Sequence, residues 1–301
     1  MYEEIARNKR RTVILIIGAL IVFGAVGWAL GILFNGGIAG LVIALVIAAL
    51  LSWSSYRYGD RIVLASARAK EVTAEQEPRL HNVVEGLCLA AGIPKPRVYV
   101  IPERAPNAFA TGRDPEHSSI AVTQGLLDMM NRVELEGVVA HELSHVRDRD
   151  ILVGTIVATL VGAVVIVSEF MLRWFWWGGV GGRRGNDRSG GGASAIFFLI
   201  GIVLLILAPI AAQVIKFAVS RRREYLADAQ GAMLTRYPPG LAEALRKIAA
   251  TDTPMRSANN ATAHLWLSQP SRVPGERISW LEKLFSTHPP IQDRIRILSE
   301  M

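Results

Sequence analysis

The chain has 301 residues and a formal net charge of +7, and 51% of its residues are hydrophobic against 20% that are charged. The mean hydropathy of +0.30 is high for a soluble protein. We find no nucleic-acid-binding motif, so a membrane surface explains the positive charge and nucleic acid is not an expected partner. The single cysteine, Cys88, excludes an intrachain disulfide and is typical of a small buried residue in a reducing compartment.

Four apolar blocks predict four transmembrane helices arranged as two hairpins, because a helix crosses a bilayer in about 20 residues. The blocks cover residues 12–34, 38–56, 151–175 and 195–219. The first is too long for the apolar core of a signal peptide, and no small-residue cleavage site follows it. A glycine-rich stretch, 178–194, predicts a flexible linker outside the membrane.

The basic residues near the block ends predict the orientation, because cytoplasmic flanks are enriched in lysine and arginine. They precede the first block and follow the second and fourth: Arg7, Lys9, Arg10, Arg11, Arg57, Arg61, Arg68, Lys70, Lys216, Arg221, Arg222 and Arg223. Three arginines in 178–194 oppose this arrangement and are offset in part by Asp187. We therefore expect both termini and residues 57–150 in the cytoplasm.

Residues 57–150 and 220–301 predict a cytoplasmic α+β part that the second hairpin interrupts. Helices are expected at 77–91, 125–130, 221–235 and 241–251 and from Pro289 onward, and strands at 97–101, 107–111 and 118–123. From Arg132 a helical pattern runs without a proline, which predicts one helix continuing into the third apolar block. Residues 252–275 form a polar loop whose length would suit a lid.

The motif H-E-x-x-H occupies residues 141–145. On a helix, His141 and His145 lie on one face, where two imidazoles can bind one zinc ion. Glu142 is then placed to accept a proton from the water that such a metal activates. The competing interpretation is a charged helix end with two exposed histidines.

A third ligand is expected in the sequence Arg223-Glu224-Tyr225-Leu226-Ala227-Asp228, directly after the fourth block. Glu224 can bind the metal, and Asp228, four residues on, can hydrogen-bond a ligand histidine. Taken alone, the arginine run is more typical of a basic anchor at the membrane surface.

These two motifs resemble those of the HtpX family of bacterial and archaeal membrane metalloproteases and, more distantly, the CAAX prenyl protease 1 family. The resemblance extends over nearly the whole chain, including 106–112 and Ser286-Thr287-His288-Pro289-Pro290. It implies a zincin-like (gluzincin) domain with one Zn²⁺ per chain bound by His141, His145 and Glu224, and Glu142 as general base. It also implies that His288 and Arg294 lie near the scissile bond, and that Asn107, Ala108, Phe109 and Ala110 contact extended substrate. From the residues alone, Asn107 and His288 remain typical of turn chemistry.

The expected protein is thus a mainly α integral membrane protein with a cytoplasmic α+β protease domain and a small sheet. We expect it in the cytoplasmic membrane of a prokaryote, where it would cleave unfolded or membrane-protein substrates and act in quality control. One competing hypothesis is an inactive zinc-binding membrane scaffold, against which Glu142 argues because a structural site does not need it. The other is a transporter, against which the near absence of ionisable residues in the apolar blocks argues.

Overall fold

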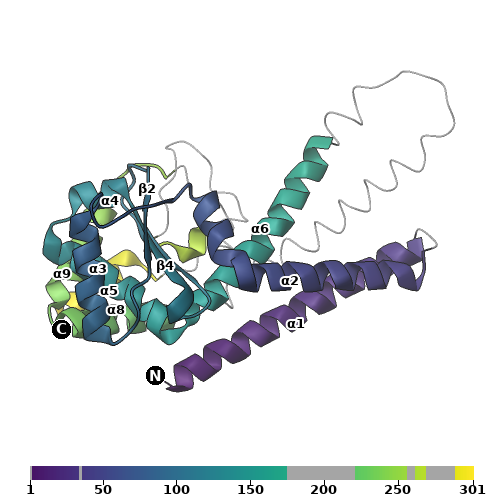
Figure 1. Ribbon diagram of the computed structural model, residues 1–301, viewed down its shortest axis with the longest axis horizontal. Coiled ribbons are helices and arrows are strands. Elements are labelled where there is room, and N and C mark those ends of the chain that lie inside the picture. Colours follow the sequence, from purple (N-terminus) through teal and green to yellow (C-terminus); the bar gives the residue numbers. More distant parts are fainter. Residues whose placement is uncertain (1, 34–35, 175–220, 256–261, 269–288) are drawn as a thin grey trace.

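The computed structural model describes residues 2–33, 36–174, 221–255, 262–268 and 289–301. Within them the protein is mostly helical with one small mixed sheet. Three long helices project from a body that contains the sheet and the other helices (Figure 1). The fourth predicted span, 195–219, and the glycine-rich linker, 178–194, lie outside the described residues.

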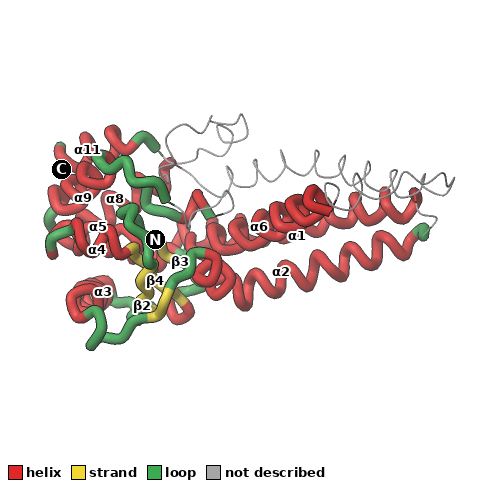
Figure 2. Tube along the Cα trace, turned by 90° about the horizontal axis from the view of Figure 1, so that it is seen from above, coloured by secondary structure: helices red, strands yellow, loops and turns green. Residues whose placement is uncertain are grey.

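The projecting helices are α1 (Tyr2–Leu33), α2 (Ile38–Ser66) and α6 (Asp150–Trp174). They extend from the body in a similar direction in Figure 2, whereas Figure 1 shows α6 diverging from α2 along its length. The first two pack closely because glycines face each other: a Cβ on Gly27 would lie 2.6 Å from the carbonyl oxygen of Gly40. Among the described residues, α2 is the one helix both long and apolar enough to cross a membrane, and only 17% of its most apolar window is buried.

The sheet has the order β1-β2-β4-β3. Its strands are β1 (Lys70–Glu71), β2 (Arg97–Ile101), β3 (Ala108–Gly112) and β4 (Ser118–Thr123). The β2 and β4 strands are parallel, and the two outer pairs are antiparallel. The predicted strands at 97–101 and 118–123 are confirmed. The strand predicted at 107–111 is also present, as β3, but it begins and ends one residue later. Because β3 is an edge strand, one row of its backbone groups faces away from the sheet.

Alternating residues of the sheet enter two separate buried clusters, as the two-residue period of a strand requires. One face packs on α3 (Pro78–Ala91) and α5 (Arg132–Asp148) through Val98, Val100, Ala108, Ala110, Ile120 and Val122. The other face packs on the end of α2 and on Trp266 through Tyr99, Ile101, Phe109 and Ala121. The remaining elements of the body are η1 (Pro115–His117), α4 (Gln124–Met129), α8 (Arg221–Thr235), α9 (Pro238–Ala249), η3 (Ala263–Leu265) and α11 (Ile291–Ser299).

The prediction of one continuous helix from Arg132 into the third apolar block is wrong. The α5 helix ends at Asp148, and Arg149 adopts a left-handed conformation with φ of 58° before α6 begins at Asp150. A residue in this conformation stops the helical hydrogen-bond ladder and turns the chain. The first turns of α6 are then enclosed by protein, since residues 151–161 are all buried.

Candidate active site

The α5 helix carries the H-E-x-x-H motif in its buried interior. The helix starts with a capping box: the Asn131 side chain accepts the backbone N–H of Glu134 at 3.0 Å, and the Glu134 carboxylate accepts that of Asn131 at 2.8 Å. His141 and Glu142 are 1% and 2% exposed. Their positions are therefore fixed by packing against the sheet and α8.

Glu224 reaches the two histidines from α8. This helix approaches α5 closely because Gly231 faces its backbone, where a Cβ would lie 3.0 Å from the amide nitrogen of His141. The Nε2 atoms of His141 and His145 are 3.2 Å apart, and each lies 3.8 Å from an oxygen of Glu224. The structure thus brings together all three predicted ligands, with their ligand atoms within 4.8 Å of one another.

This arrangement fits a single zinc ion. Zinc–ligand bonds of about 2.1 Å in a tetrahedron place the ligand atoms about 3.4 Å apart, close to the three distances found here. Two imidazole nitrogens and one carboxylate are also a common catalytic donor set, which leaves a fourth position for water or substrate.

Each ligand histidine has a carboxylate partner on its other ring nitrogen. The Nδ1 atom of His141 lies 2.9 Å from Asp228, and that of His145 lies 2.9 Å from Asp150. The sequence predicted a contact of this kind for Asp228 but not for Asp150. On a straight helix, residues five apart diverge by about 140°, so only the turn at Arg149 allows Asp150 to face His145.

Arg294, on α11, lies behind the ligands and is 1% exposed. Its Nε and Nη2 atoms donate to the two carboxylate oxygens of Asp228 at 2.8 and 2.7 Å, and Nη1 donates to the Leu267 carbonyl at 2.8 Å. It is also 3.9 Å from Glu224. In this arrangement the guanidinium is directed to the partner of a ligand histidine. His288 lies outside the described residues.

Burial and neighbouring charges shift the pKa values of the site residues in different directions. Burial raises the pKa of Glu142 to about 7, against the lowering effect of His145. Burial alone would lower the pKa of His145, but the carboxylates of Asp150 and Glu224 raise it to about 10. Likewise burial would raise the pKa of Asp228, whereas Arg294 and His141 lower it to about 2. Burial lowers the pKa of His141, so its imidazole is held neutral, the form that binds a metal.

The predicted substrate-binding residues line the edge of the sheet beside this cluster. Ala108, Phe109 and Ala110 belong to β3, and Asn107 directly precedes it. The backbone N–H of Ala110 donates to the Glu142 carboxylate, which links the strand to the predicted general base. Asn107 is 2% exposed, and its side chain is hydrogen-bonded to the backbone of Ser268.

A small cavity of about 40 Å³ lies at the ligand cluster, lined by Ala110, His141, Glu142, His145, Glu224 and residues 264–267 among others. His264 belongs to this lining, and its Nε2 atom lies 3.1 Å from the carbonyl oxygen of Gly154. The sequence did not indicate this position, because the spacing of His264 to the other histidines gives no sign of a shared site. Its position depends on a long-range fold of the chain that no local pattern reports.

Comparison with known proteins agrees with this geometry. A sequence model of peptidase family M48 matches residues 74–301. The chain is 46% identical over 303 residues to a protein named Protease HtpX homolog from Thermoanaerobacter pseudethanolicus, covering 100% of this chain and 98% of the relative. It is 44% identical over 306 residues to a protein of the same name from Lactobacillus acidophilus, with 100% of each chain covered.

Among solved structures, the Ste24p crystal structure from S. mikatae aligns with 99% of this chain and 67% of its own, at 17% identity and a TM-score of 0.48. The family match covers strands β2, β3 and β4, the H-E-x-x-H helix and the helix that supplies Glu224. With relatives of 42–46% identity over the full length, the chain belongs to peptidase family M48, a family of metalloproteases.

Proposed function

We propose that the protein is a zinc-dependent endopeptidase, held in the membrane by several helices, that cleaves polypeptides at the cytoplasmic face. The observation that supports this most directly is the position of Glu142. Glu142 lines the same small cavity as His141, His145 and Glu224 and is itself 2% exposed. A structural metal site has no need of a further buried carboxyl group beside its ligands, whereas a hydrolytic site needs a general base there.

The residues of the site have separate tasks in this proposal. Zinc, when bound, would polarise the peptide carbonyl and lower the pKa of a water molecule. Glu142 accepts a proton from the attacking water and delivers it to the leaving amine. The aspartates hold both histidines with Nδ1–H donated outward, which leaves the Nε2 lone pairs directed at the metal. Arg294 balances the charge of the buried Asp228 carboxylate.

The membrane part of the proposal is supported by the exposed apolar surface of α1 and α2. Large apolar side chains point outward along both helices: Val13, Ile14, Ile17, Ile21, Val42, Ile43, Val46, Leu50 and Trp53. A soluble monomer rarely exposes so much contiguous apolar surface. Arg57 and Arg61 lie further along the same helix α2, between these apolar residues and the body. Basic residues at this end of the helix are consistent with a cytoplasmic position for the body.

The substrates we propose are unfolded or damaged membrane polypeptides, which fits a role in quality control. An extended peptide would add as a strand beside Asn107 to Thr111, so that main-chain hydrogen bonds supply most of the affinity. Such recognition is broad, because every peptide has the same backbone. A second candidate function, a zinc-binding scaffold without turnover, shares the ligand set and differs only in having no task for Glu142.

Substitution of Glu142 by glutamine separates the two functions. The experiment measures zinc content and cleavage of an unfolded polypeptide by the full-length protein in detergent. We expect Glu142→Gln to retain one zinc ion per chain and to lose cleavage. The matched control is Glu136→Gln on the same helix, where Glu136 pairs with the exposed Arg132 and is remote from the metal. Cleavage by Glu142→Gln at the rate of the wild type would contradict the proposal.

A further inference from the structure

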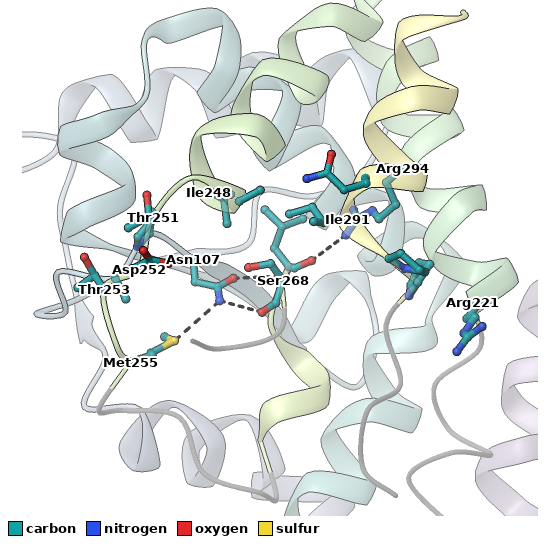
Figure 3. Close-up of a pocket in the computed structure, with 17 residues that line it drawn as sticks. Asn107, Arg221, Ile248, Thr251, Asp252, Thr253, Met255, Ser268, Ile291 and Arg294 are labelled. Carbon is teal, nitrogen blue, oxygen red and sulfur yellow. Dashed lines mark hydrogen bonds between the residues drawn. The ribbon is translucent and has the colours of Figure 1, made fainter. Parts of the chain in front are cut away.

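The outward edge of β3, where a substrate strand would bind, is already occupied by the chain itself. The backbone N–H of Leu267 donates to the carbonyl oxygen of Ala108 at 2.8 Å. The Asn107 side chain accepts the N–H of Ser268 at 3.2 Å and donates to its carbonyl oxygen at 2.9 Å. Figure 3 shows the contacts between Asn107 and Ser268. The carbonyl oxygen of Ala108 and the Asn107 side chain are therefore engaged by the chain's own backbone rather than open to a peptide.

The same segment covers the ligand cluster. Residues 264–267 line the cavity of about 40 Å³ that contains His141, Glu142 and His145. A space of this size takes a few water molecules, at about 10–15 Å³ each, and is small for a peptide residue. A peptide strand paired with the carbonyl oxygen of Ala108 would therefore overlap Leu267 in its present position.

Trp266 packs against the sheet face that is turned away from α5, and there it holds the segment in place. Its ring lies edge-on to Phe109 with the centroids 4.8 Å apart, and the residue is 1% exposed. Its indole N–H is buried without a hydrogen-bond partner among the described residues. An unsatisfied buried donor weakens the closed arrangement, because water would satisfy this group once the segment moves.

Next to the segment is a second cavity of about 450 Å³ (Figure 3). Asn107, Met255, Leu267 and Ser268 line it, together with Ile291 and Arg294 from α11. It has room for side chains of a bound peptide, and Leu267 and Ser268 both line it and contact Ala108 and Asn107. A peptide that displaced these two residues would gain both the strand edge and this space.

We propose that residues 262–268 are a pseudosubstrate segment, and that a peptide reaches the metal ligands by taking their place on β3. This inference rests on the proposed peptidase function. The protein is then self-inhibited at rest, and the apparent affinity for substrate is reduced by the fraction of molecules that are closed. The packing of Trp266 against Phe109 also indicates the substrate class. We expect extended peptides whose large aromatic or apolar side chain takes the place of the Trp266 ring.

The proposal is tested with a short quenched-fluorescence peptide containing a tryptophan, cleaved by zinc-loaded full-length protein. Ser268→Pro removes the N–H that binds Asn107, whereas its matched control, Ser268→Ala, keeps the backbone N–H. We expect Ser268→Pro to lower KM about fivefold with kcat unchanged, the effect of one hydrogen bond on the closed state. Trp266→Ala should lower KM about tenfold or more, while Trp53→Ala, on the exposed face of α2, should match the wild type.

A second measurement does not depend on turnover. In the Glu142→Gln protein, amide hydrogen exchange at residues 262–268 should become faster when the peptide binds. Unchanged KM in folded, zinc-loaded Ser268→Pro, or slower exchange on peptide binding, would overturn the pseudosubstrate segment while leaving the peptidase function intact. Absence of cleavage by the wild type and by all variants would instead overturn the peptidase function, and this inference with it.

Discussion

Removal of the Asp150 carboxylate should weaken zinc binding although Asp150 is not itself a ligand. The residue is 7% exposed and accepts the Nδ1–H of His145 at 2.9 Å. A hydrogen bond to a charged group contributes about 1.5–3 kcal/mol, and loss of such partners typically costs 10–100-fold in metal affinity. We therefore expect Asp150→Ala to raise the Kd for zinc about 10–100-fold, with Asp150→Asn between it and the wild type.

The assay is competition for zinc between metal-free protein and a chromogenic chelator, followed at equilibrium. Asp148→Asn is the matched control, because Asp148 is a buried aspartate two residues away that accepts a hydrogen bond from Gln230 and contacts no ligand histidine. A Kd for folded Asp150→Ala within twofold of the wild type would refute the reasoning. So would an equal loss in Asp148→Asn, because the effect would then be general to this junction.

Three further outcomes follow from the described contacts. Glu224→Ala should reduce bound zinc from one ion per chain to well below one, measured by elemental analysis after dialysis, because two histidines alone bind weakly. Arg294→Ala leaves the Asp228 carboxylate buried without its cation and should destabilise the body by about 3–5 kcal/mol, measured by chemical denaturation, whereas a loss below about 1 kcal/mol would contradict this. Burial raises the pKa of the Cys88 thiol to about 11, so it should react with disulfide reagents at pH 8 far more slowly in the folded than in the unfolded protein; equal rates would show that it is accessible.

The sequence allowed the metal ligands to be selected because each depends on a local pattern. The pair His141 and His145 follows from the helical period, and Glu224 from a charged motif that begins a helix. Strands β2 and β4 could also be predicted from the sequence, since each contains several apolar residues that favour strands. The β1 strand was not predicted, because two exposed residues carry no periodicity.

What the sequence could not reveal depends on contacts between distant segments or on a single backbone dihedral angle. The link between Asn107 and Ser268 joins residues 161 positions apart, and nothing in the polar loop 252–275 marks the two residues that lie on β3. The role of Asp150 depends on the left-handed conformation of Arg149, which a non-glycine residue seldom adopts. The continuous helix predicted from Arg132 would instead have placed Asp150 about 140° around the axis from His145.

The α6 helix also determines where the membrane-associated helices can be removed from the catalytic body. Its first residue, Asp150, holds a ligand histidine, and Thr155 accepts the backbone N–H of Gly112 at 3.1 Å and bonds to the Thr111 hydroxyl at 2.8 Å. The first turns of this apolar helix thus support, through hydrogen bonds, both the ligand cluster and the strand that would receive substrate. A water-soluble catalytic fragment that lacks α6 from Ile151 onward would lose the hydrogen bonds of Thr155 to β3. Crystallisation or biosensor variants should instead retain α6 to about Val161 and replace the outward apolar residues of α1 and α2.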